Sequence, residues 1–106
     1  MSDQPAALTP GLYLRVPNTQ IALRVLEGPG EQATTVTWSY GPPIRVEVVL
    51  CRPYATYNLG TLELGDWGRA EQPRVQVHAE WTDGRIEARI RNAETQEYAE
   101  MFATPR

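Results

Sequence analysis

The sequence predicts an all-β protein, an antiparallel β-sandwich with a single core. Apolar and polar side chains alternate along most of the chain, which is the period of strands with one buried face. Glycine and proline, 8 and 9 of the 106 residues, fall between these runs as turn signals. The runs number about seven, and they are short and closely spaced, as in sandwiches and barrels.

Length and composition indicate one globular domain. A chain of 106 residues supports one hydrophobic core, and its 42% hydrophobic and 22% charged residues are ordinary globular usage. We expect residues 9–106 to form the sandwich and residues 1–8 to be a flexible segment. No apolar stretch is long enough for a signal peptide or a membrane span, so we expect no membrane association.

Charge and cysteine content exclude several classes of function. The net charge is −3, and nucleic-acid binding needs clustered positive charge, so we expect no nucleic-acid partner. One cysteine excludes an intrachain disulfide, and with one histidine it cannot supply a four-ligand zinc site. No glycine-rich phosphate loop is present. We therefore expect no metal, no cofactor and a location in the reducing cytoplasm.

The N-terminal third contains three expected strands. Residues 12–16 and 21–25 alternate in hydropathy on either side of a turn at residues 17–19. A Gly-Pro-Gly turn at residues 28–30 separates them from residues 34–40, whose Thr, Val, Trp and Tyr content favours a strand.

The middle of the chain contains two more expected strands. Residues 44–51 begin as an alternating run and become apolar on both faces at Val49 and Cys51, which indicates a central strand. Residues 59–64 form a shorter strand, and residues 65–73 read as a long connection.

The clearest element is a hairpin between residues 73–81 and 86–91. Its turn, Asp83-Gly84, is the preferred pair for a two-residue hairpin because both turn residues need positive φ. Pairing across this turn puts the apolar side chains of both strands on one face, with Trp81 opposite Ile86 and Val77 opposite Ile90. The last stretch, residues 94–102, fits either a short C-terminal helix or a closing strand.

Several of these segments occur in an order that belongs to a known family. The run Leu59-Gly60-Thr61-Leu62 precedes the long connection, then come Pro73-Arg74-Val75, the Asp83-Gly84 hairpin and an alternating strand. Thr9-Pro10 also matches the pair that opens the family's domain. This order resembles the β-sandwich substrate-binding domain of DnaK-type chaperones, the seventy-kilodalton heat-shock family. The resemblance covers the sandwich, and not the family's ATPase domain or helical lid.

The resemblance implies a peptide- or protein-binding module without catalysis. An extended polypeptide would lie in a channel formed by the loops after the first and third strands and by inward side chains of the sheet below. Carried over to this sequence, the channel residues are Leu14, Val16, Pro17, Trp38, Tyr40, Ile44, Val46 and Val75. Small apolar pockets of this kind accept a leucine-like side chain, while main-chain hydrogen bonds hold the extended backbone.

Three other interpretations stay open. The residues of the implied channel could simply form the sandwich core. A structural or adaptor sandwich would instead use its surface in an assembly, with Trp67 and Tyr98 as candidate contacts. A small hydrolase would need the thiol of Cys51 within hydrogen-bond reach of His78.

Overall fold

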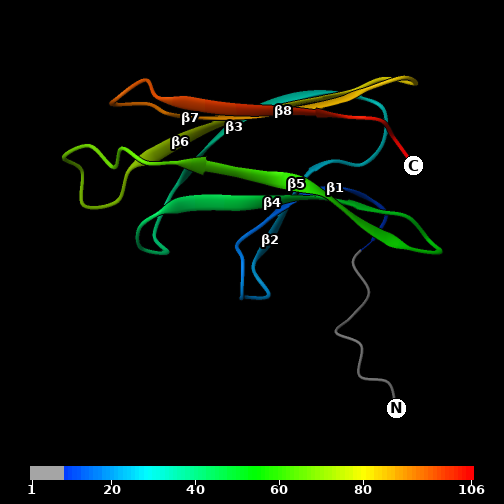
Figure 1. Cartoon of the computed structure of the whole chain (residues 1–106), viewed down its shortest axis with the longest axis horizontal. Coiled ribbons are helices and arrows are strands. Elements are labelled where there is room, and N and C mark those ends of the chain that lie inside the picture. Colours follow the sequence, from blue (N-terminus) through cyan, green and yellow to red (C-terminus); the bar gives the residue numbers. More distant parts are fainter. Residues whose placement is uncertain (1–8) are drawn as a thin grey trace, which may run out of the picture.

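Two four-stranded antiparallel sheets pack face to face (Figure 1) in a computed structural model that describes residues 9–106. The expectation for residues 1–8 lies outside the described residues. The strand order is β2-β1-β4-β5 in the first sheet and β3-β6-β7-β8 in the second. The all-β sandwich is therefore confirmed. Its strands are β1 (Gly11–Arg15), β2 (Ala22–Leu26), β3 (Gly30–Thr37), β4 (Ile44–Cys51), β5 (Thr56–Leu64), β6 (Arg74–Trp81), β7 (Ile86–Asn92) and β8 (Tyr98–Ala103).

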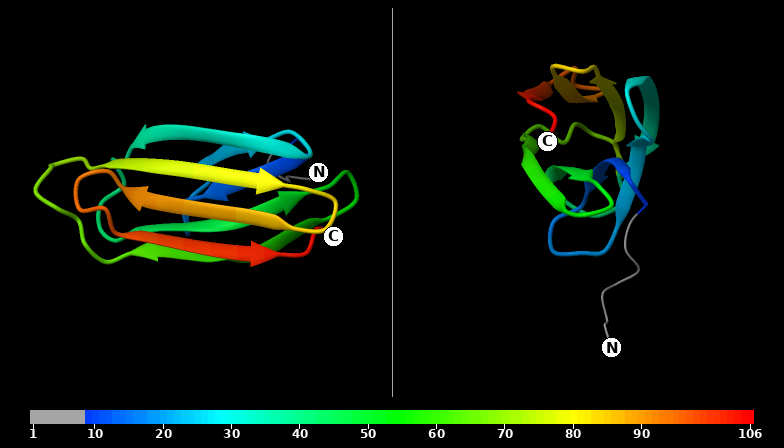
Figure 2. Two further views of the ribbon diagram at one scale, coloured as in Figure 1. Left: turned by 90° about the horizontal axis from the view of Figure 1, so that it is seen from above. Right: turned by 90° about the vertical axis from the view of Figure 1, so that its right-hand side faces the viewer.

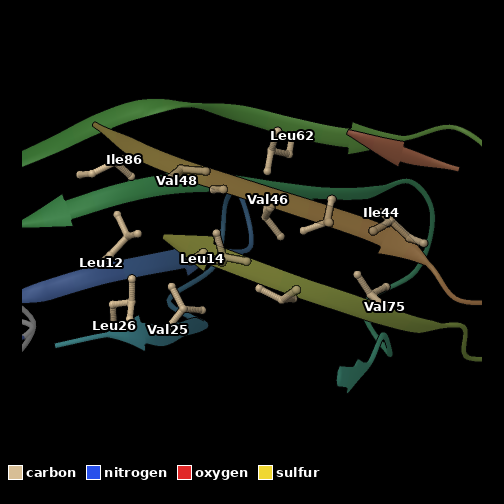
Figure 3. Packing of buried hydrophobic residues seen from close by; sticks show 14 of the residues in the cluster. Leu12, Leu14, Val25, Leu26, Ile44, Val46, Val48, Leu62, Val75 and Ile86 are labelled. Atoms are coloured by element: carbon tan, nitrogen blue, oxygen red, sulfur yellow. The ribbon is translucent and has the colours of Figure 1, made fainter. Parts of the chain in front are cut away.

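The core lies between the sheets and consists of the inward positions of each strand. Leu12 and Leu14 of β1 and Val46 and Val48 of β4 point into this space from one sheet, and Val75 of β6 does so from the other (Figure 3). Burial of each such aliphatic side chain contributes about 1.5–3 kcal/mol. β4 lies between β1 and β5, which confirms it as a central strand.

The β6–β7 hairpin has the predicted register. Trp81 pairs with Ile86 and Val77 with Ile90, and the Thr82 amide donates to the Arg85 carbonyl at 2.8 Å. The expected backbone conformation of the turn is wrong, however. The φ of Gly84 lies outside the left-handed region, and a Cβ added there would meet nothing within 4 Å. The turn therefore does not require glycine at this position.

The C-terminal stretch forms a closing strand, and the short helix that was its alternative is not present. β8 pairs with β7 from Tyr98 to Ala103. Ala99 and Met101 are half-buried against the core, while the side chains between them are exposed, which is the alternation of a strand. Pairing with the edge of β7 outweighs the helical spacing of the apolar residues.

The two side edges of the sandwich differ. At one edge Met101 of β8 approaches β5 so closely that a Cβ at Gly60 would lie 3.0 Å from its sulfur. At the other edge the chain crosses from one sheet to the other through residues 27–29, which connect β2 to β3 (Figure 2). β2 and β3 are thus the outer strands of opposite sheets at this edge, and each pairs on one side only.

A buried asparagine holds the loops at one end of the sandwich. Asn92 is fully buried, and its side-chain amide donates to the carbonyls of Asp66 and Trp67, each at 3.1 Å. Its side-chain oxygen accepts from the amides of Glu94 at 2.8 Å and Thr95 at 3.2 Å. The single residue thus joins the β5–β6 connection to the β7–β8 turn.

Candidate binding groove

An apolar groove of about 230 Å³ opens between the start of β2 and the end of β3. It lies at the edge where these two strands belong to opposite sheets. Both sheets contribute to its lining, so it leads from the surface into the space between them. The lining residues are Leu14, Val16, Ile21, Ala22, Leu23, Val36, Thr37, Trp38, Tyr40, Val46, Val75, Val77 and Ile90.

The floor of the groove consists of core side chains. Leu14 and Val46 come from the first sheet, and Val75 and Val77 come from the second. All four are buried members of the main hydrophobic cluster. Among residues 9–106, no charged residue contributes to the lining, so a ligand here must be apolar where it enters.

Trp38 forms one wall of the groove and is held in place by its own hydrogen bonds. Its backbone amide donates to the Pro73 carbonyl at 2.8 Å, which continues the β3–β6 pairing past Thr37. Its indole Nε1 donates to the Gly41 carbonyl at 2.8 Å. The ring packs edge-on against Tyr40, with centroids 5.1 Å apart and planes at 89°. This contact fixes the direction of the exposed tyrosine.

The rim of the groove exposes large apolar side chains. Ile21, Leu23 and Tyr40 are 42%, 40% and 47% exposed. They are three of the six large hydrophobic side chains that are exposed among residues 9–106. The turn that carries Ile21 is closed by its carbonyl, which accepts from the Val16 amide at 2.9 Å. Clustering of apolar surface around a groove is typical of an interaction site.

Six of the eight residues implied by the chaperone resemblance line this groove. They are Leu14, Val16, Trp38, Tyr40, Val46 and Val75. Pro17 lies half-buried in the β1–β2 turn and does not line it. Ile44 is 1% exposed and belongs to the core.

The sequence interpretation missed the other seven lining residues, among them Ile21, Leu23 and Val36. The alternation of residues 21–25 predicted a strand with an inward face, but exposure of that face depends on β2 being an outer strand. Val36 is an inward position of β3, opposite Val75. Its half-exposure likewise results from the edge position of β3, which local sequence does not specify.

The groove suits an apolar side chain of an extended segment. Its volume lies below the roughly 300–1,000 Å³ of sites for drug-sized ligands. Along β3 the backbone pairs with β6 on one side, and the other side faces the groove edge. Unpaired amides and carbonyls of an outer strand can bind the backbone of an added strand, while pockets bind its side chains.

The thiol–imidazole alternative does not have its required geometry. Cys51 is buried on the outer face of the first sheet, beside Tyr13 and Val49. His78 lies on the outer face of the second sheet, where its Nε2 is 2.7 Å from a Glu31 carboxylate oxygen. The two sheets and the core separate these side chains, so they cannot form a nucleophile and base pair.

No protein-family model and no curated protein matches this chain. No helix within residues 9–106 is long and apolar enough to cross a membrane. Fold and groove together define a β-sandwich with an apolar groove at one open edge. The resemblance to DnaK-type substrate-binding domains stays a prediction.

Proposed function

We propose that this protein is a binding module that holds a short, extended, apolar segment of a polypeptide in the groove between β2 and β3. The observation that carries the proposal is the exposed apolar rim around a groove whose floor is the core itself. The groove lies between the loop after β1 and the loop after β3, where the chaperone resemblance implies a peptide channel.

One apolar side chain would supply most of the binding energy. Its burial contributes about 1.5–3 kcal/mol, and backbone hydrogen bonds to β3 add to this. Ordering of the peptide opposes both terms, so we expect micromolar or weaker affinity, about −8 kcal/mol at best. Residues 9–106 include no segment that covers the groove, so dissociation should be fast.

Titration of a labelled leucine-rich heptapeptide, followed by fluorescence anisotropy, tests this function. Val36→Phe should fill the groove from a half-buried outer strand and weaken binding at least tenfold. Val75→Phe would be a poorer test because Val75 is 2% exposed and the larger ring would overpack the core.

Two tyrosines provide a matched pair of variants. Tyr40→Ala removes part of the rim and should weaken binding severalfold. Tyr54→Ala removes an equally large exposed ring that does not line the groove and should leave binding unchanged. Absence of binding by the wild-type protein, or equal affinity of the Val36→Phe variant, would contradict the proposal and favour the adaptor interpretation.

A further inference from the structure

A second, chemically different concavity lies on the outer face of the β3-β6-β7-β8 sheet. It is an open trough of about 570 Å³. Ala33 and Thr35 of β3 and Gln76 of β6 are small or uncharged side chains on this face, and Arg89 and Arg91 of β7 stand beside them. The remaining lining residues are Thr34, Val77, His78 and Tyr98.

Within the part of the chain that the structure describes, the arginines of the trough are not neutralised. Within residues 9–106, neither Arg89 nor Arg91 has a carboxylate within ion-pair distance. Arg91 is held by its Nε, which donates to the Gln76 side-chain oxygen at 2.8 Å, and its terminal nitrogens remain available. Glu100 pairs with Arg89 in the strand register but makes no ion pair with it.

Acidic residues border the trough at its end near the β6–β7 turn and at Glu100 of β8, which lies beside Arg89. Glu31, Glu80 and Glu87 occupy one row across β3, β6 and β7, toward the β6–β7 turn. The row that contains Arg91 also contains Thr35, Gln76 and Tyr98, none of which is acidic. An anionic ligand is therefore attracted to the half of the face that is distant from the β6–β7 turn.

We infer that this trough is a docking surface for an acidic, extended segment of a partner protein. Arg89 and Arg91 are two residues apart on one strand, so they are spaced by about 6.6–6.8 Å along the face. Carboxylates at alternate positions of an extended segment have the same spacing, and the arginine fork binds a carboxylate through two hydrogen bonds. Exposed Tyr98 provides apolar contact at the end of the Arg91 row.

An acidic polypeptide fits this face better than a nucleic acid does. A phosphate backbone needs many positive contacts along its length. Beyond the two arginines it would meet the neighbouring glutamate row, which repels it. A short segment with two properly spaced carboxylates can occupy the arginine half alone. The trough is on the outer face of its sheet, so this interaction is independent of the groove between the sheets.

The experiment measures binding of a labelled nine-residue peptide with glutamate at alternate positions and threonine between, by anisotropy at low and high salt. Arg89→Gln combined with Arg91→Gln should weaken binding at least tenfold. Arg45→Gln combined with Arg69→Gln makes the same change in net charge away from the trough and should change affinity less than twofold. High salt should weaken binding by the wild type.

A second variant tests the trough without removal of arginine. Thr35→Glu places a carboxylate on its exposed floor and should abolish binding, whereas Thr61→Glu on the other sheet should not. Three results would overturn the inference. They are no binding of the glutamate peptide, equal loss in the two arginine double variants, and tighter binding of a decameric oligouridine than of the peptide.

Discussion

Asn92 makes four side-chain hydrogen bonds, more than any other polar side chain in residues 9–106, and it has no exposed surface. Asn92→Ala should lower the free energy of unfolding by about 2–4 kcal/mol because it removes four part-buried hydrogen bonds and leaves a cavity at a fully buried position. Urea denaturation measures this change. Asn58→Ala is the control: Asn58 is exposed and its side-chain oxygen binds one amide, that of Gly60, so the loss should be below about 1 kcal/mol. Equal losses would contradict the role assigned to Asn92.

Two glycines should respond differently to replacement by alanine. Gly68 has a φ of 80°, and a Cβ there would lie 2.6 Å from a Glu94 carboxylate oxygen. Gly68→Ala should therefore destabilise the protein by about 1–3 kcal/mol. Gly84→Ala should change stability by less than about 1 kcal/mol because its φ is ordinary and its surroundings are open. Thermal unfolding distinguishes them, and a larger effect at Gly84 would show that its turn needs positive φ after all.

Among the elements, the long β5–β6 connection is held from outside by carboxylates of the β7–β8 turn. The Glu94 carboxylate accepts from the Arg69 amide at 3.0 and 3.1 Å and from the Ala70 amide at 3.3 Å. These bonds hold the peptide bond that trypsin would cut after Arg69.

Glu94→Ala should therefore accelerate tryptic cleavage after Arg69 severalfold, because the released loop can adopt the extended conformation that a protease binds. Mass spectrometry of timed digests measures the rate. Glu71→Ala removes an exposed carboxylate within the same loop and should not change it. Equal acceleration by both substitutions would mean that loop charge, and not the Glu94 contact, limits cleavage.

Sequence alone predicted those elements whose pairing is local. The β6–β7 register followed from alternation on both sides of one turn, and the apolar end of β4 at Val49 and Cys51 indicated a central strand. β3 was expected at residues 34–40 but spans Gly30–Thr37, since residues 31–33 (Glu, Gln, Ala) of an outer strand show no apolar alternation. The groove was predicted only in part, because the exposure of Ile21 and Leu23 depends on the order of strands in the sheet, which local sequence does not specify. The arginines of the trough come from one strand, but its floor comes from strands distant in sequence.

At the scale of the whole molecule, the sandwich has one closed edge and one open edge. Met101 packs over Gly60 where β8 meets β5, whereas the β2–β3 edge contains the groove. Interior strands β1, β4, β6 and β7 pair on both sides. Stability against local opening should therefore be distributed unevenly, with the weakest part at the groove.

Hydrogen exchange measured by nuclear magnetic resonance should reveal this distribution. Amides of β4 and of the β6–β7 pair should exchange most slowly, because their hydrogen bonds lie beneath core side chains and open only on global unfolding. Amides of residues 21–23 and 36–37 should exchange at least a hundredfold faster, which corresponds to about 2.7 kcal/mol less protection. Saturation with the leucine-rich peptide should slow the exchange of amides at the groove, because these amides gain hydrogen bonds and lose access to water. The exchange rates of β7 amides should not change. Equal protection of β3 and β4 in the free protein would mean that the groove is closed in solution, and would remove the physical basis for peptide binding there.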